Sequence, residues 1–408
     1  MELRHGIFGT FLPNNYSRTN RLIVHLLSIV GARPQFVKVA AIADAISRHN
    51  ESASAGKSVR HTLVHTGQHY DPKMSDSFFE QLGIPNPDHN LEVGSGSHGK
   101  QTGMMLDRIE QILLNERPDA VIVYGDTNST VAGALAAAKL HIPVAHVEAG
   151  LRSFNRRMPE EINRVVTDHL SQVLLCPTET AVRNLANEGI VDGVFVVGDV
   201  MLDAVLRWRQ EAALKSTVLR DLGLRRGGYV LLTLHRAENT NSVERLQQIL
   251  CAILDLRHPV IFPMHPRTRE SIKANPVLAP LAERIARSEF IRVIEPVSYL
   301  EMIALEDNAR IILTDSGGVQ KEAYFVGVPC VTLRHETEWV ETLRGGWNRL
   351  VEPANTSLSA AVDDLWDQGT SYPREKPDLS CFGLGRASED IVKAVLGVMD
   401  ERERGFNA

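Results

Sequence analysis

Short runs rich in Val, Ile and Leu alternate with amphipathic stretches of helical length from Leu22 onward. Continuous apolar runs are typical of strands buried on both faces, and the amphipathic stretches between them are typical of the helices that cover those faces. The pattern predicts an α/β fold built on parallel sheets. The expected strands are residues 22–30, 61–66, 120–124, 144–147, 173–176 and 194–197, then 229–234, 260–263, 290–293, 311–314 and 330–333.

These strands form two series, and 408 residues are too many for one simple core. We therefore predict two Rossmann-like, doubly wound domains that face a cleft. The boundary is expected between Gly198 and Gly228, where residues 199–215 are predicted to form a helix followed by a polar connection. Residues 22–200 with 385–408 are assigned to the first domain, residues 201–384 to the second, and residues 1–21 to an N-terminal extension.

The formal net charge of −6 provides no general attraction to nucleic acid or to an anionic membrane, so we expect a small-molecule partner. The four cysteines are far apart and lack CxxC or Cys/His spacing, which argues against a disulfide framework and against a zinc site. No apolar stretch approaches the ~20 residues of a membrane helix, and the N-terminus lacks the apolar core of a signal peptide. These features predict a cytoplasmic protein.

Gly94, Gly96 and Gly99 spell the GxGxxG pattern of dinucleotide-binding folds. In those folds the pattern directly follows a strong strand, and an acidic residue stands about 20 positions further on. Here only the weak stretch 90–93 precedes it, and the acid of the next strand, Asp126, comes late. We interpret the glycines as a flexible loop before a helix, with NAD binding as the less favoured alternative.

Charged residues follow three predicted strands of the first series. Arg33 and Lys38 come after the strand at 22–30, Asp126 after the strand at 120–124, and Glu148 after the strand at 144–147. The carboxyl ends of parallel strands lie at one edge of a sheet, which is where open α/β sheets bind ligands, so these side chains are expected to converge. The alternative for Asp126 is that it caps the next helix.

Glu160 and His235 are two further candidates, each with a structural alternative. Glu160 follows Pro159 at a predicted helix start, where the helix dipole favours acidic residues in any case. However, an Arg-rich loop, residues 150–157, leads to it from Glu148. His235 follows the strand at 229–234, and a lone histidine is more often structural than catalytic.

Ser316, Gly317 and Gly318 follow the predicted strand at 311–314 and open a helix. Two glycines permit close approach of a ligand to the backbone, and the free N–H groups at a helix start can hold a phosphate. Glu322 stands one helical turn further, where it could accept hydrogen bonds from a ribose diol. A plain turn is the alternative.

Together, residues 31–38, 124–130, 146–152, 159–164, 235–238 and 314–322 resemble the motifs of the non-hydrolysing UDP-N-acetylglucosamine 2-epimerases, and the resemblance runs from Leu22 to Val398. It implies the two-domain GT-B fold, with the nucleotide bound by the second domain, a homodimer, and neither metal nor NAD. The residues it implies are Asp126, Glu148, Glu160 and His235 for catalysis; Arg33 and Lys38 along the substrate; Ser316, Gly317 and Gly318 at the β-phosphate; Glu322 at the ribose; and Arg236, His265 and Arg334 as further nucleotide contacts.

Two departures from the family pattern bear on substrate and regulation. Many members have Thr-Glu-Arg-Pro-Glu where this chain has Thr-Glu-Trp-Val-Glu at residues 337–341, a variant shared with relatives that act on more decorated sugars. Members regulated by their own substrate have Gln-His-Arg where this chain has Gln68, His69 and Tyr70. A second, regulatory substrate site is therefore not expected from the resemblance.

The chemistry favours elimination over oxidation. The C2–H bond of an N-acetylhexosamine is not next to a carbonyl, so either a cofactor oxidises C3 or UDP leaves from C1 as the C2 proton is lost. Without a convincing nicotinamide site, we expect loss of UDP to give 2-acetamidoglucal, followed by protonation on the other face. Alternatives are a hydrolysing 2-epimerase, a GT-B glycosyltransferase and a UDP-sugar sensor without activity.

Overall fold

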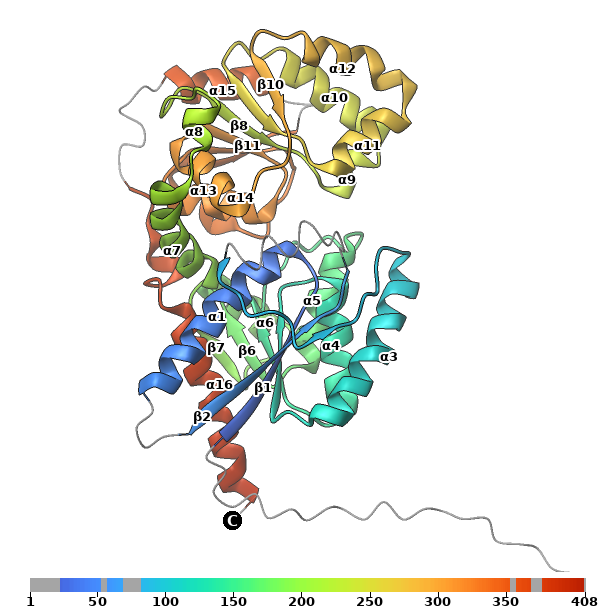
Figure 1. Ribbon diagram of the computed structural model, residues 1–408, viewed down its shortest axis with the longest axis vertical. Coiled ribbons are helices and arrows are strands. Elements are labelled where there is room, and N and C mark those ends of the chain that lie inside the picture. The colour runs from blue at the N-terminus through green and yellow to red at the C-terminus, as the bar shows by residue number, and fades with distance from the viewer. Residues whose placement is uncertain (1–22, 53–56, 69–81, 353–356, 368–375, 407–408) are drawn as a thin grey trace, which may run out of the picture.

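The computed structural model describes residues 23–52, 57–68, 82–352, 357–367 and 376–406. Two sheets, each with helices on both faces, make up the molecule (Figure 1). The first sheet has seven strands in the order β3-β2-β1-β4-β5-β6-β7, all pairs parallel. Its strands are β1 (Ile23–Val30), β2 (Ser58–His65), β3 (His89–Asn90), β4 (Ala120–Tyr124), β5 (Val144–Val147), β6 (Val173–Cys176) and β7 (Val194–Val196).

Alternate residues of β1 face two separate apolar cores, as the pleat of a strand requires. Leu26 and Val30 pack in the core beneath α1 and α16, whereas Leu27 and Ile29 pack in the core beneath α3 and α4. Both faces are buried, which is why the strand reads as a continuous apolar run. The helices of this sheet are α1 (Arg33–Ser52), α3 (His98–Glu116), α4 (Asn128–Lys139), α5 (Pro159–Leu170) and α6 (Glu179–Asn187).

The second sheet has six parallel strands in the order β10-β9-β8-β11-β12-β13. They are β8 (Val230–Thr233), β9 (Val260–Pro263), β10 (Ile291–Ile294), β11 (Ile311–Thr314), β12 (Cys330–Thr332) and β13 (Asn348–Leu350). The helices are α8 (Val218–Asp221), α9 (Ala237–Thr240), α10 (Val243–Leu254), α11 (Pro266–Ala274), α12 (Ala279–Ala286), α13 (Tyr299–Asn308), α14 (Gly317–Val326) and α15 (Leu358–Asp367). Short 3-10 turns cover Pro276–Leu278, Val340–Gly346 and Leu379–Phe382.

Helix α7 (Val200–Lys215) joins the two sheets. It packs against α1 and α16 on the first sheet and against α13 and α14 on the second (Figure 1). One apolar core consequently continues from the α1 face of the first sheet to the α14 face of the second, with Trp208 of α7 buried in it. The last helix, α16 (Ala387–Phe406), packs against α1, α7 and β6. The division of the chain into domains at residues 200 and 385 stays a prediction.

The predicted parallel α/β fold is confirmed. Every expected strand is present; most bounds agree within two residues, and β2 begins three residues early, at Ser58. The short, mostly polar β13 was not predicted. Gly94 and Gly96 lie in the loop between the two-residue β3 and α3, as expected, and Gly99 lies in the first turn of α3. Residues 1–21, His69 and Tyr70 lie outside the described residues.

None of the helices within the described ranges combines the length and the apolar composition that crossing a membrane requires.

Asp203 of α7 anchors the start of α16. Its carboxylate accepts hydrogen bonds from the backbone N–H groups of Ala387 (3.1 Å) and Ser388 (2.8 Å) and from Ser388 Oγ (2.7 Å). We predict that Asp203→Ala lowers the free energy of unfolding by about 1 to 3 kcal/mol, because the N–H groups lose a charged acceptor. Asp203→Asn, which keeps one acceptor oxygen, is the matched control and should lose less in urea unfolding. Wild-type stability of the alanine variant would show that α16 is held by its apolar face alone.

Candidate active site

Four charged side chains meet in a buried cluster where the two sheets face each other. Glu148, directly after β5, accepts a hydrogen bond from Lys38 of α1 on Oε2 and one from Lys321 of α14 on Oε1, the latter at 2.8 Å. Lys321 Nζ also donates to Asp199 Oδ2 at 2.6 Å. All four side chains are buried. The expected meeting of Lys38 and Glu148 is therefore observed, and Lys321 joins them from the second sheet.

The backbone of Glu148 has a φ of +69°, in the left-handed region that residues with side chains seldom adopt. Its N–H donates to the carbonyl of Leu175 in β6 at 3.1 Å, so the turn is fixed to the neighbouring strand. Burial raises the pKa of Glu148, but the charges of Lys321 and Lys38 and their hydrogen bonds outweigh burial and lower it to about 2. Glu148 is therefore ionised at neutral pH.

Asp199 occupies the N-cap of α7, where its Oδ1 accepts from Met201 N at 2.8 Å. Burial raises its pKa and the nearby Glu148 adds to that effect, although Lys321 acts in the opposite direction. The two carboxylates thus differ in electrostatic setting. Glu148 accepts hydrogen bonds from two lysines, whereas Asp199 accepts from one of these lysines and from a backbone N–H at the start of α7.

Asp126, after β4, does not cap α4. The N-cap is Thr127, which forms a capping box with Thr130, so the capping interpretation of Asp126 is wrong. The carboxylate of Asp126 instead accepts a hydrogen bond from Arg164 of α5, and Asn163 Nδ2 donates to its backbone carbonyl at 2.9 Å. Its side chain is 32% exposed, which leaves the second carboxylate oxygen available to a ligand.

Glu161 of α5 explains how the Arg-rich loop reaches this region. Its carboxylate accepts from the N–H groups of Ser153 and Phe154, both at 2.9 Å, and from Arg164 Nη1 at 2.6 Å. The loop and the first turn of α5 are therefore one unit. Glu160 lies in that turn and is partly exposed.

Arg236 links these carboxylates to the second sheet. Its guanidinium lies 3.4 Å from Glu338 Oε1, and Glu338, then Glu160 and Asp126, raise its pKa against the effect of burial. Glu160 and Asp126 belong to the first sheet, and Arg236 follows β8 of the second. The structure therefore places Asp126, Glu160 and Arg236 within electrostatic reach of one another.

His235 also follows β8. Its backbone N–H donates to both oxygens of Asp315 at 3.1 Å, and its ring lies 5.3 Å from the ring of His265. Burial and the charges of Arg236, Arg267 and Arg33 lower the pKa of His235, so its ring is neutral at pH 7. Burial and then the charges of His235, Arg267 and Arg33 lower the pKa of His265 to about 4. His265 Nδ1 accepts from Arg267 N at 3.1 Å, which leaves the ring proton on Nε2.

The turn at Ser316 begins α14. Ser316 is the N-cap, and its side chain accepts from Val319 N. A Cβ on Gly317 would stand 2.6 Å from Glu338 Oε1 and 3.4 Å from Arg236 Nη2, so any side chain there would displace the Glu338 carboxylate. A Cβ on Gly318 would meet nothing closer than Ser316 Oγ at 3.8 Å, so that position is comparatively open.

Glu338 neutralises the arginines beside Gly317. Arg334 Nη1 donates to its Oε2 at 3.0 Å, and although burial raises the pKa of Glu338, Arg236, Arg334 and Arg164 lower it to about 2. Arg334 is buried, and two of its nitrogens, Nε and Nη2, have no hydrogen-bond partner among the described residues. Such donors are suited to an anionic ligand.

Glu322, one turn into α14, is buried and accepts a hydrogen bond from Tyr299 Oη at 3.1 Å. Burial raises its pKa, while the Tyr299 hydrogen bond and the charges of Lys321, Arg33 and Lys38 oppose that rise. Burial lowers the pKa of Arg33, at the start of α1, and Glu322 is near enough to oppose that lowering. The first turn of α1 therefore lies close to the first turns of α14.

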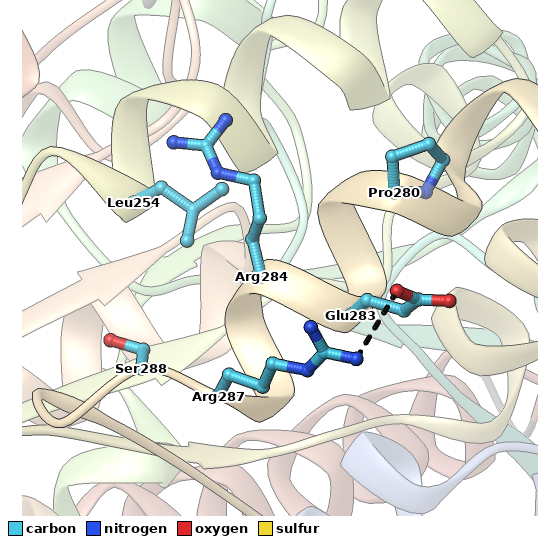
Figure 2. Close-up of a pocket in the computed structure, with 6 residues that line it drawn as sticks. All are labelled: Leu254, Pro280, Glu283, Arg284, Arg287 and Ser288. Atoms are coloured by element: carbon cyan, nitrogen blue, oxygen red, sulfur yellow. Dashed lines mark ion pairs between the residues drawn. The ribbon is translucent and has the colours of Figure 1, made fainter.

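A separate pocket of about 460 Å³ lies against α12 (Figure 2). The residues that line it are Leu254, Pro280, Glu283, Arg284, Arg287 and Ser288. Arg287 pairs with Glu283 at 3.7 Å. None of the site residues predicted from the sequence lines this pocket, so it is distinct from the groups described above.

Four residues of the site were not predicted from the sequence: Lys321, Asp199, Arg164 and Glu338. Lys321 stands inside the motif at 314–322, but that motif indicated only a phosphate turn and a ribose contact. Asp199 was interpreted as part of a connecting helix. For Lys321 and Arg164 the signal that would have found them is a charged residue within a helix, since such a residue needs a partner when it is buried. Asp199 precedes α7 and Glu338 lies between β12 and the 3-10 turn at Val340–Gly346, so no helix pattern marks those two.

Two parallel sheets that meet through charged groups at their strand ends define an α/β enzyme of the GT-B-like class. Residues 51–396 match the family model described as UDP-N-acetylglucosamine 2-epimerase, and the chain therefore belongs to that family. Family membership makes it an enzyme with epimerase activity.

Similar proteins agree with this assignment. A "UDP-N-acetylglucosamine 2-epimerase homolog" of Methanococcus maripaludis is 55% identical over 91% of this chain and 99% of the relative. The UDP-2,3-diacetamido-2,3-dideoxy-D-glucuronate 2-epimerase of Pseudomonas aeruginosa is 49% identical over 90% of this chain and 98% of the relative. The crystal structure of Methanocaldococcus jannaschii UDP-GlcNAc 2-epimerase in complex with UDP-GlcNAc and UDP has a TM-score of 0.82 and 44% identity, covering 92% of this chain and 99% of that one.

We predict that Glu322→Ala raises KM for a UDP-sugar with a smaller effect on kcat. A ribose contact remote from the reacting carbons contributes mainly uniform binding, which appears in KM. Glu322→Gln, which keeps an acceptor oxygen for one ribose hydroxyl, is the matched control and should shift KM less. Steady-state kinetics on both variants test this, and a large fall in kcat with KM unchanged would assign Glu322 to the chemical step instead.

Proposed function

We propose that this enzyme interconverts UDP-N-acetylglucosamine and UDP-N-acetylmannosamine without hydrolysis. One observation carries the proposal: Asp126, whose carboxylate accepts a hydrogen bond from Arg164, and Glu160, both from the first sheet, lie near Arg236, whose guanidinium borders Gly317 at the start of α14. The carbon that is epimerised, C2, is bonded to C1, which carries the diphosphate. Acid/base carboxylates must therefore stand directly beside a phosphate site, and these residues meet that requirement.

The reaction balances without an oxidant. A base removes the C2 proton as the C1–O bond breaks, and the products are UDP and 2-acetamidoglucal with a C1–C2 double bond. Protonation of C2 on the opposite face and return of the UDP oxygen to C1 give the epimer. Departure of the diphosphate requires cations and N–H donors, for which we propose Arg33, Lys38 and the turn at residues 316–318.

The acid/base groups are drawn from Asp126, Glu148, Glu160 and His235. Glu148 is ionised between its two lysines, and Asp126 pairs with Arg164 while one of its oxygens stays open to a ligand. His235 is neutral at pH 7 and can therefore accept or donate a proton. Arg236, His265, Arg334 and Glu322 complete the proposed nucleotide site.

We further propose that the enzyme acts as a cytoplasmic homodimer on a UDP-sugar and uses neither metal nor NAD, as the family resemblance implies. The solved relative from M. jannaschii, in complex with UDP-GlcNAc and UDP, supports a UDP-sugar as the ligand.

Incubation with UDP-N-acetylglucosamine in deuterated water tests the proposal. Deuterium at C2 of recovered UDP-sugar, in both epimers, is the expected result. Free UDP with N-acetylmannosamine would indicate a hydrolysing 2-epimerase. UDP release only when an acceptor sugar is added would indicate a transferase, and no exchange with retained binding would indicate a sensor.

We predict that Asp126→Asn, Glu148→Gln and Glu160→Gln each reduce C2 exchange by roughly 10²- to 10⁴-fold, the usual range for loss of a positioned acid or base. Melting temperature, measured on the same samples, separates a chemical role from a structural one. Glu161→Gln is a control from the same helix turn, because Glu161 orders the loop through hydrogen bonds. It should lower stability more than Glu160→Gln does. Near wild-type exchange by all three folded variants would exclude the proposed site.

A second candidate is the 2-epimerisation of a more decorated UDP-sugar of the 2,3-diacetamido type. The 49% identical relative from P. aeruginosa carries that activity in its name, and Trp339 and Val340 replace the Arg and Pro of many family members. Initial rates of C2 exchange with UDP-N-acetylglucosamine and with UDP-2,3-diacetamido sugars, with and without a C6 carboxylate, decide between the two. A higher kcat/KM for the plain sugar would remove this candidate.

A further inference from the structure

The ammonium of Lys321 has three partners within the protein, two carboxylates and an aromatic ring. Nζ donates to Glu148 Oε1 at 2.8 Å and to Asp199 Oδ2 at 2.6 Å, and it lies 3.7 Å from the centroid of the Trp339 ring. Its side chain is 2% exposed. An ammonium so enclosed holds its partners in one geometry, because any displacement would leave a buried charge unpaired.

The position of Lys321 ties the phosphate turn to Glu148. It lies one helical turn after Gly317 on α14, so the two move as one body. Trp339 contacts both Gly317 and Lys321. A Cβ built on Gly317 would stand 3.4 Å from Trp339 Nε1, and the Trp339 ring covers Lys321 Nζ. A diphosphate that settles on the start of α14 would therefore lie on the same rigid helix as the lysine that holds Glu148.

The charges of the cluster balance when all four members are present. Lys38 from α1, Lys321 from α14 and Asp199 from the start of α7 are the charged groups that face Glu148. Under the proposed function Lys38 also serves the diphosphate, and a lysine drawn toward phosphate interacts less with Glu148. Lys321 has no such second duty and remains as the cation that keeps Glu148 ionised and oriented.

We propose that Lys321 is a positioning residue for Glu148, and that it ties the ionised, oriented state of that carboxylate to the packing of α14 against the first sheet. The inference rests on the proposed function of Glu148. It predicts that the ionisation of Glu148 depends on contact between α14 and the first sheet. Domain contact would then assemble the acid/base site as well as enclose the substrate.

The test compares Asp199→Asn with the double variant Asp199→Asn/Lys321→Met. The double variant retains a balanced Lys38–Glu148 pair and is therefore expected to fold even if Lys321→Met alone does not. Relative to Asp199→Asn, we expect kcat for C2 exchange to fall about tenfold or more, with KM changed less than about threefold. Removing a cation raises the pKa of Glu148, so the acidic limb of the kcat–pH profile should move to higher pH.

Each outcome is decisive. Equal kcat and equal pH profiles in the single and double variants would mean that Lys321 only neutralises Asp199, and the inference would be overturned. If the wild-type enzyme exchanges no C2 proton, the proposed function fails by itself. The coupling is then read from the carboxyl ¹³C resonance of Glu148, assigned by its absence in Glu148→Gln. Titration at higher pH in the double variant than in Asp199→Asn supports the coupling, and identical titration overturns it.

Discussion

Parallel strand direction decides where the charged groups of this protein can meet. All strand pairs that the structure describes are parallel, so the loops after β1, β4 and β5 leave one edge of the first sheet and those after β8 and β11 leave one edge of the second. Every helix that follows these strands starts at the same edge, with free N–H groups pointing toward it. Because the two edges face each other through α7, residues more than 150 positions apart, such as Glu148 and Lys321, come into hydrogen-bond contact.

Charges brought together in this way must be balanced within the protein. Two lysines meet two carboxylates around Glu148, and Arg236, Arg334 and Arg164 surround Glu338. Buried ion pairs add little net stability, because desolvation offsets much of the attraction, but removing one partner is costly. The two clusters therefore specify the relative position of the sheets more than they stabilise it. They also set the electrostatics of the site: the arginines beside Gly317 are already neutralised, so an arriving phosphate competes with Glu338 for the same guanidinium groups.

The sequence predicted the features that depend on local pattern and on topology. Apolar runs predicted the long strands, and the parallel direction then predicted that Lys38 and Glu148 would meet. Short polar β13 has no such pattern, since Asn348 and Arg349 are two of its three residues. Asp126 pairs with Arg164 of α5, and Glu148 pairs with Lys321 of α14. Both pairs depend on how these helices are rotated in the packed molecule, and the periodicity of the sequence does not encode that rotation. Asp126 was considered as the N-cap of α4, although the N-cap is Thr127. Which of two adjacent residues forms the N-cap depends on the orientation of one peptide, and a sequence motif does not resolve that orientation.

Trp339 and Val340, which distinguish this chain from many members of its family, differ in how they can affect substrate choice. Val340 is 44% exposed, whereas Trp339 is 4% exposed and lies against Lys321 and Gly317. An arginine in place of Trp339 would put a second cation beside the Lys321 ammonium, and two unit charges 4 Å apart repel by on the order of 4 kcal/mol in a partly screened protein environment. An arginine at position 339 would therefore be unfavourable while Lys321 is present. Because Trp339 contacts both Lys321, which donates to Glu148, and Gly317, its effect on substrate choice is expected to act through the acid/base cluster and the turn that begins α14.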